Sequence, residues 1–100
     1  MTLRNALVGA LAVVSLAACG TTTPSSDSGK IQVVASTNVW GSVIKAVGGD
    51  EVEVKALLDD PSADPHSYES KPADAALVKD AKLVVFNGGG YDDWMQRLVE

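Results

Sequence analysis

Short β-branched runs alternate with helix-periodic segments from residue 30 onward, and this alternation constrains the fold more than any other feature. The expected strands are rich in Val, Leu and Ala and cover residues 31–35, 52–58 and 82–87. The expected helices cover residues 38–47, 72–80 and 91–100. The order β-α-β-α-β-α with short connections predicts an α/β fold, in which a parallel sheet of βα repeats has helices on both faces.

The helix boundaries and buried faces follow from local signals. The first helix has an apolar stripe that we expect to be buried: Val39, Trp40, Val43, Ile44 and Val47. Gly48 and Gly49 supply its C-terminal stop. The second helix opens at Pro72 with Asp74 in its first turn. Its expected apolar side is modest and consists of Ala73, Ala76, Leu77 and Ala81. In the third helix Trp94 and Leu98 share a face, which favours core packing over cofactor stacking.

Every loop that follows a strand of a parallel sheet emerges at the carboxyl edge, where open α/β folds bind their ligands. Three loops meet this description: residues 36–38, 59–68 and 87–90. The second reads DDPSADPHSY and contains His66, the only histidine of the chain. Topology alone therefore predicts that His66 lies on the binding edge.

The His66 loop offers ligand chemistry for a metal. A neutral imidazole suits Zn²⁺ or another first-row divalent ion. Carboxylates could come from Asp59, Asp60 and Asp64, while Pro61 and Pro65 stiffen the backbone. One histidine without an HxxxH, HExxH or CxxC pattern is also compatible with an exposed loop histidine among turn-forming aspartates. The aspartates do not match a calcium-binding loop, which needs alternating ligands and a glycine.

The stretch NGGGYDD at residues 87–93 invites a phosphate-loop interpretation, which the residues exclude. Asp93 occupies the third glycine position of the dinucleotide fingerprint, and no Gly-Lys-Ser/Thr motif occurs. Asp92 and Asp93 would repel phosphate at a helix N-terminus and instead complement the helix dipole. We therefore expect a tight strand-to-helix turn here.

The first 18 residues predict an export signal. Arg4 precedes an apolar run of thirteen residues, 6–18, which is shorter than the roughly 20 residues that a spanning helix needs. Residues 16–20 (LAACG) resemble the bacterial lipobox, which implies lipidation of Cys19 and cleavage before it. An ordinary signal peptide with a chance cysteine and a buried structural thiol are the alternatives. Residues 19–29 then predict a lipidated flexible tether, since they are rich in Thr, Ser, Pro and Gly.

Composition narrows the choice of partners. Cys19 is the only cysteine, so an intramolecular disulfide is impossible. The formal charge is −5, with 13 acids against 8 Lys and Arg, and no basic stripe is present. This argues against nucleic acid and anionic headgroups as partners. Residues 30–100 are further expected to be a truncated part of a larger protein, because three parallel strands leave unpaired edges and poorly covered faces.

Taken together, these segments resemble one family, the metal-binding lipoproteins of ABC importers (cluster A-I zinc/manganese solute-binding proteins). The matching segments, in order, are the lipobox, the tether, VVAS, VGGD, VEVKALL, DPHSYESKPAD and AKLVVFNGGGYDDWM. The most specific part is Asp64-Pro65-His66 followed by Tyr68 and a Pro-opened helix. Lys71 departs from the family, which often has a capping Ser or Thr at that position.

The resemblance implies a two-lobed protein, with residues 30–100 forming the N-terminal part of its first metal-binding lobe. It implies that His66 is the first metal ligand, and that Tyr68 and the nearby acids shape the site and support the ligand. The other ligands would lie beyond Glu100.

The expected function is that of an extracytoplasmic lipoprotein, at the cell surface or in the periplasm, and not of an enzyme. It would capture a divalent metal ion and deliver it to an ABC permease. Zn²⁺ is the first choice, and Mn²⁺ or Fe²⁺ is the alternative. An exported metalloenzyme, or an adhesin-type lipoprotein that needs no metal, would be the competing classes.

Overall fold

The computed structural model describes residues 29–100. The predicted signal peptide, the lipid attachment at Cys19 and all of the predicted tether except Gly29 lie outside these residues. Within the described part of the chain, no helix combines the length and the apolar character needed to cross a membrane.

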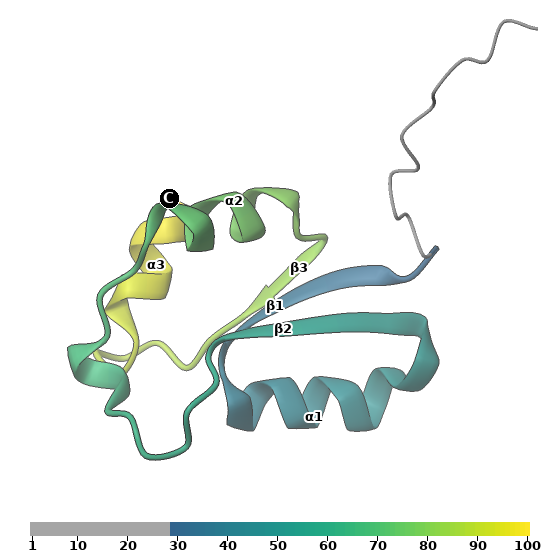
Figure 1. Ribbon diagram of the computed structural model, residues 1–100, viewed down its shortest axis with the longest axis horizontal. Coiled ribbons are helices and arrows are strands. Elements are labelled where there is room, and N and C mark those ends of the chain that lie inside the picture. The colour runs from purple at the N-terminus through teal and green to yellow at the C-terminus, as the bar shows by residue number, and fades with distance from the viewer. Residues whose placement is uncertain (1–28) are drawn as a thin grey trace, which may run out of the picture.

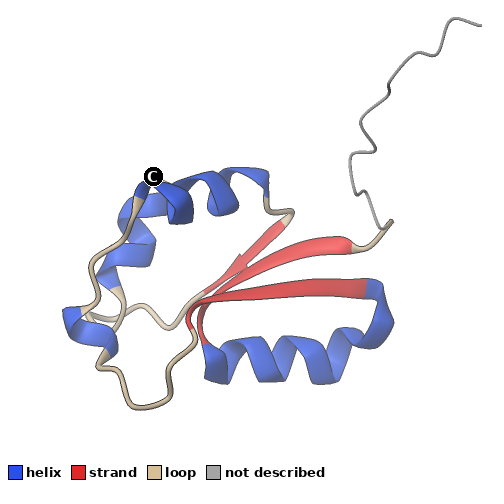
Figure 2. Ribbon diagram, viewed as in Figure 1, coloured by secondary structure: helices blue, strands red, loops and turns tan. Residues whose placement is uncertain are grey.

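The three strands form one parallel sheet, as the sequence predicted (Figure 2). β1 (Ile31–Thr37) lies in the centre, between β2 (Val52–Leu58) and β3 (Leu83–Val85). Val33 is paired with Val54 on one side and with Leu83 on the other. All three strands therefore end at the same edge, and the loops that follow them emerge there.

Helices cover both faces of the sheet (Figure 1). α1 (Asn38–Gly48) lies on one face over β1 and β2, while α2 (Pro72–Asp80) and α3 (Asp93–Val99) lie on the other. Two short 3₁₀ turns, η1 (Gly49–Glu51) and η2 (Pro65–Ser67), complete the elements. The predicted α/β class and element order are confirmed.

β1 continues to Thr37 instead of residue 35, and α1 begins at Asn38, so the predicted loop 36–38 is part of the strand and the helix. The end of β3 and the start of α3 also differ from the prediction. The strand stops at Val85 and the helix begins only at Asp93, instead of at residues 87 and 91. The reason is the carboxylate of Asp92, which accepts the backbone N–H groups of Asn87 and Gly88. Those amides are then committed to the turn and do not continue the ladder with β1.

The hydrophobic core lies between the sheet and the α2/α3 layer. Its buried members are Val34, Leu58, Val78, Trp94 and Met95. The predicted apolar side of α2 is largely wrong, because Val78 and Asp74 are its buried residues, whereas Ala73, Ala76 and Leu77 are exposed and only Ala81 packs against the core. Hydrogen bonds from the Tyr68 hydroxyl and the Lys71 N–H to Asp74 turn that acid inward, and Val78, four residues on, shares its face.

The predicted stripe of α1 is only half correct. Trp40 and Ile44 are partly buried, but Val39, Val43 and Val47 are 66%, 47% and 85% exposed. The helix approaches the sheet through its glycines instead. A Cβ atom at Gly41 would lie 3.5 Å from the Cβ of Ala56, and one at Gly48 would lie 2.6 Å from the methyl groups of Val52. A hydropathy pattern does not register a contact face made by residues without side chains.

We expect Gly48→Ala to destabilise the protein and Gly41→Ala to be tolerated. Gly48 has right-handed helical dihedrals, which alanine adopts without strain. The destabilisation therefore comes from the steric clash of the new methyl group with the buried side chain of Val52. Overpacking of this kind costs about 1–3 kcal/mol, whereas Ala at Gly41 makes ordinary contacts and gains up to about 1 kcal/mol of helix propensity. Urea unfolding of the mature protein, which is expected to begin at Cys19, measures both. Equal effects of the two substitutions would contradict the packing of α1.

Candidate metal site

The loop between β2 and α2 is built from two successive turns, each centred on an Asp-Pro pair. Asp60 Oδ1 accepts the backbone N–H of Ser62 at 2.9 Å and its hydroxyl at 2.7 Å. These two hydrogen bonds lower the pKa of Asp60. In the second turn, Asp64 precedes η2, and its Oδ1 accepts the backbone N–H of His66 at 2.9 Å. The turn-forming role that the sequence allowed for these aspartates is therefore present.

His66 lies at the end of this second turn, with its ring held from two sides. Its Nδ1 is 2.8 Å from Asp64 Oδ1, and both side chains are 60% exposed. The hydrogen bonds from the His66 ring and backbone lower the pKa of Asp64. The Tyr91 ring meets the imidazole edge-on, with centroids 5.0 Å apart and planes at 72°.

The backbone on either side of His66 is fixed to the helices. The indole Nε1–H of Trp94, in α3, donates to the Pro65 carbonyl at 2.8 Å, and Trp94 is only 2% exposed. The Tyr68 ring packs on the Trp94 ring at 4.4 Å, and its hydroxyl donates to Asp74 Oδ2 in α2 at 2.8 Å. Core packing of Trp94 is confirmed. Its hydrogen bond to the loop was not predicted, because sequence separation conceals it.

Asp74 is a buried acid that closes the start of α2 and holds Tyr68. Its Oδ2 also accepts the backbone N–H of Lys71 at 2.8 Å, while its own N–H donates to the Lys71 carbonyl at 2.9 Å. This reciprocal contact closes the first turn of the helix without a capping Ser or Thr. Burial, followed by the hydrogen bond to Asp74, raises the pKa of Tyr68 to about 12.

Asp92 has a role that the sequence did not predict. It lies at the N-cap of α3, with Asp93 in the first turn, as expected, but its side chain makes no cap hydrogen bond there. It is fully buried instead, and its two oxygens accept Gly88 N–H at 2.7 Å and Asn87 N–H at 2.8 Å. Gly88, Gly89 and Gly90 all have positive φ, between 64° and 88°. The expected tight turn is confirmed, and Asp92 organises the segment that carries Tyr91.

A small hollow of about 80 Å³ lies at the carboxyl edge. Its lining includes Thr37 at the end of β1, Asn38 at the start of α1, Pro61 and Pro65 after β2, and Tyr91 after β3. The prediction that the segments following the strands meet at this edge is confirmed for the loops after β2 and β3, whereas the predicted loop 36–38 is replaced by a direct junction of β1 and α1. Pro65 and Tyr91 flank His66 there.

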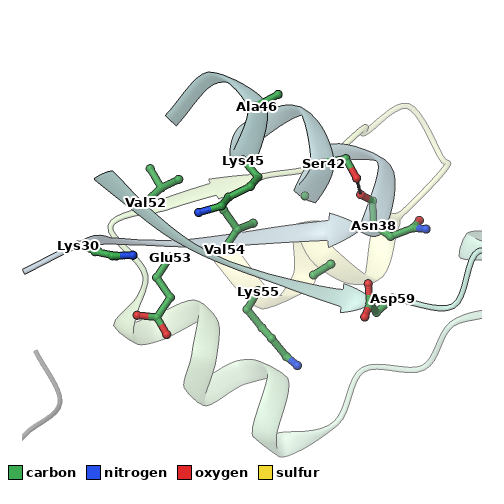
Figure 3. A pocket seen from close by; sticks show the side chains of 12 residues that line it. Lys30, Asn38, Ser42, Lys45, Ala46, Val52, Glu53, Val54, Lys55 and Asp59 are labelled. Atoms are coloured by element: carbon green, nitrogen blue, oxygen red, sulfur yellow. Dashed lines mark hydrogen bonds between the residues drawn. The ribbon is translucent and has the colours of Figure 1, made fainter. Parts of the chain in front are cut away.

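A larger open groove of about 1020 Å³ lies elsewhere, between α1 and β2 (Figure 3). Figure 3 shows Lys30, Lys45 and Lys55 along it, together with Glu53 and Asp59. His66 does not line this groove. The three lysine side chains of the groove are poor metal ligands, because a protonated amine has no lone pair to offer.

The described residues bring together one imidazole and the side chains that hold it, not a complete coordination set. Across residues 29–100, no group of three or more His, Cys, Asp or Glu side chains is arranged to hold a metal ion. Of the acids considered from the sequence, Asp60 closes its own turn, Asp59 lines the groove beside α1, and Asp64 contacts the imidazole.

Comparison with known proteins identifies similar chains along most of this length. Residues 33–100 match the family described as ZnuA, zinc-uptake complex component A, periplasmic. The manganese ABC transporter substrate-binding lipoprotein scaA of Streptococcus gordonii is 34% identical over 96 residues, which cover 90% of this chain and 31% of that protein. The iron ABC transporter substrate-binding lipoprotein MtsA of Streptococcus pyogenes is 32% identical, over 90% of this chain and 30% of that protein.

Solved structures agree with these sequence matches. The periplasmic zinc binding protein TroA from Treponema pallidum superposes with a TM-score of 0.64 and 27% identity, covering 70% of this chain and 25% of that one. The Zn(II)-bound ZnuA-like domain of Streptococcus pneumoniae AdcA gives 0.61 and 29%, covering 71% of this chain and 26% of that one. The chain thus spans about three tenths of the length of the curated relatives it matches.

We expect Tyr68 to ionise only near pH 12. Its folded-state pKa is raised from 10 to about 12, so the stability that it contributes is fully present below pH 10 and is lost as the pH rises through 12. In a Tyr91→Phe variant Tyr68 is the only tyrosine, and near-ultraviolet phenolate absorbance then reports its pKa directly. Circular dichroism at each pH controls for unfolding. A midpoint near 10 in the folded protein would contradict the contact with Asp74.

Proposed function

Because the chain belongs to the family of zinc-uptake complex component A proteins, we propose that it forms part of an extracytoplasmic solute-binding protein for a divalent metal ion. The protein would capture the ion and deliver it to the permease of an ABC importer. It would make and break no covalent bond. Relatives with 34% and 32% identity are described as substrate-binding lipoproteins of ABC transporters, which supports this assignment.

His66 is the proposed metal ligand of this chain. The observation that carries the proposal is the place of the ring, which follows β2 at the carboxyl edge of the sheet and contacts Tyr91 from the segment between β3 and α3. The ring is 60% exposed, and the backbone beside it is held by Trp94 through the Pro65 carbonyl. An accessible imidazole on a fixed backbone suits a ligand, because little ordering entropy is lost when the ion binds. The remaining ligands would come from outside the described residues.

Zn²⁺ is the proposed cargo, with Mn²⁺ or Fe²⁺ as the alternative. The matching family is described by zinc uptake, and two similar solved structures are described as zinc proteins. Relatives described as manganese and iron lipoproteins support the alternative. An imidazole nitrogen binds all three ions, so the choice depends on the other ligands and on the site's geometry.

The predicted N-terminal segments complete the proposal. Export by residues 1–18, lipidation of Cys19 and the tether 19–29 would hold the metal-binding part near the outer face of a membrane. The description of the relatives as lipoproteins supports this. Such a position would keep the captured ion close to the permease and raise the effective concentration of the complex.

We expect His66→Ala to weaken Zn²⁺ binding by at least about tenfold in the mature protein. Loss of a supporting residue alone costs about 10–100-fold in metal affinity, and loss of a ligand should cost no less. Competition with a chromogenic chelator measures the affinity after the protein has been stripped of metal. Lys79→Ala changes an exposed residue of α2 and is the control, which should leave the affinity unchanged. An affinity within a factor of two of the parent would show that His66 is not a ligand.

Parallel titrations with Mn²⁺ and Fe²⁺ identify the cargo. The proposal expects Zn²⁺ to be retained in competition with either ion at equal concentration. Preferential retention of Mn²⁺ or Fe²⁺ would identify that ion as the cargo instead of Zn²⁺. Weaker binding of that ion by His66→Ala would still support the metal-capture function.

A further inference from the structure

We propose that Asp64 is a positioning residue that selects which nitrogen of His66 faces the metal. Its carboxylate accepts the proton of Nδ1, so the lone pair of Nε2 is left for the ion. This inference rests on the proposed function, in which His66 is a ligand. It adds the residue that fixes the tautomer and the direction of that ligand.

The geometry arises within three consecutive residues. Pro65 restricts Asp64 to extended backbone, and Asp64 has φ −83° and ψ 116°. This conformation places one oxygen, Oδ1, within 2.9 Å of the His66 backbone N–H and within 2.8 Å of Nδ1. The same oxygen thus fixes both the turn and the ring. Because an ionised carboxylate has no proton to donate, Nδ1 must carry the shared proton.

A second set of contacts prevents the pair from moving as a unit. The Tyr91 ring abuts the imidazole edge-on at 5.0 Å, and Trp94 holds the Pro65 carbonyl between Asp64 and His66. The ring is therefore restrained from the β3–α3 segment as well as from its own loop. Hydrogen bonding of the distal nitrogen to a carboxylate also raises the basicity of the nitrogen that binds the metal.

The chain contains its own comparison for this role. Asp60 and Asp64 each precede a proline, and each accepts the backbone N–H two residues on at 2.9 Å. At Asp60 the second contact goes to the Ser62 hydroxyl, whereas at Asp64 it goes to an imidazole nitrogen. A purely structural role for these aspartates predicts similar consequences at both positions. A positioning role predicts that only Asp64 changes the chemistry of His66.

The decisive experiment is the tautomer of His66 in the metal-free protein. Long-range ¹H–¹⁵N correlation spectra identify which ring nitrogen is protonated, and the chain has a single histidine, so the signals are unambiguous. Spectra are recorded at a series of alkaline pH values until the ring signals no longer change. We expect a protonated Nδ1 in the parent protein. Free imidazole side chains in water favour a protonated Nε2, so this result is not the default.

Three variants separate the possible roles of Asp64. We expect Asp64→Ala to shift His66 toward the Nε2-protonated form and to weaken Zn²⁺ binding by about 10–100-fold. Asp64→Asn keeps an acceptor oxygen and should preserve the Nδ1-protonated form, with a smaller loss of affinity. Asp60→Ala removes the comparable turn contact and should leave the tautomer unchanged. If Asp64→Ala fails to fold by circular dichroism, the parent and Asp64→Asn spectra still decide the question.

The outcomes distinguish this inference from the proposed function. A parent protein with protonated Nε2, or an Asp64→Ala variant that folds with an unchanged tautomer, would overturn the positioning role. Equal losses of affinity in Asp64→Asn and Asp64→Ala would overturn it in favour of Asp64 as a direct ligand. If the tautomer behaves as expected but His66→Ala binds Zn²⁺ normally, Asp64 orients the ring and the metal-capture function of His66 fails instead.

Discussion

The indole of Trp94 connects the hydrophobic core to the His66 loop. Its ring is buried among Val34, Val78 and the other residues of the core cluster, while its Nε1–H donates to the Pro65 carbonyl. A buried indole N–H without a partner is costly, so the loop carbonyl stabilises the core as the core holds the loop. The position of His66 thus depends on the packing of α3 against the sheet.

Two buried acids extend this arrangement on either side. Asp74 holds the Tyr68 hydroxyl and the start of α2, and Asp92 holds the turn that presents Tyr91. Burying a carboxylate is unfavourable unless it is hydrogen-bonded, and both acids accept charge-assisted bonds shorter than 3 Å. These hydrogen bonds hold Tyr68 and the turn before α3 in one conformation. A side chain that presents a single nitrogen to an ion benefits from such rigidity, because its direction is set before the ion arrives.

The sequence predicted the elements well and their faces poorly. β2 and α2 have the predicted bounds, and the parallel sheet brings the loop of His66 to the carboxyl edge as expected. The predicted faces of α1 and α2 were partly wrong, since apolar periodicity assumes that the most apolar side is the contact side. In α1 the sheet is approached through Gly41 and Gly48, and in α2 the inward side includes Asp74. None of these three residues carries an apolar signal.

The sequence by itself determined the alternation of strands and helices, the Asp-Pro-His turn and the place of the only histidine after the second strand. These depend on local backbone preferences and on the topology of parallel sheets, which neighbouring residues encode. Only the tertiary structure decided that the Trp94 indole holds the Pro65 carbonyl and that the Tyr91 ring contacts His66. Trp94 lies 29 residues from Pro65, and Tyr91 lies 25 residues from His66 in the numbering (91 minus 66). Contacts across such distances form only when β3 pairs with β1 and α3 packs on the same core.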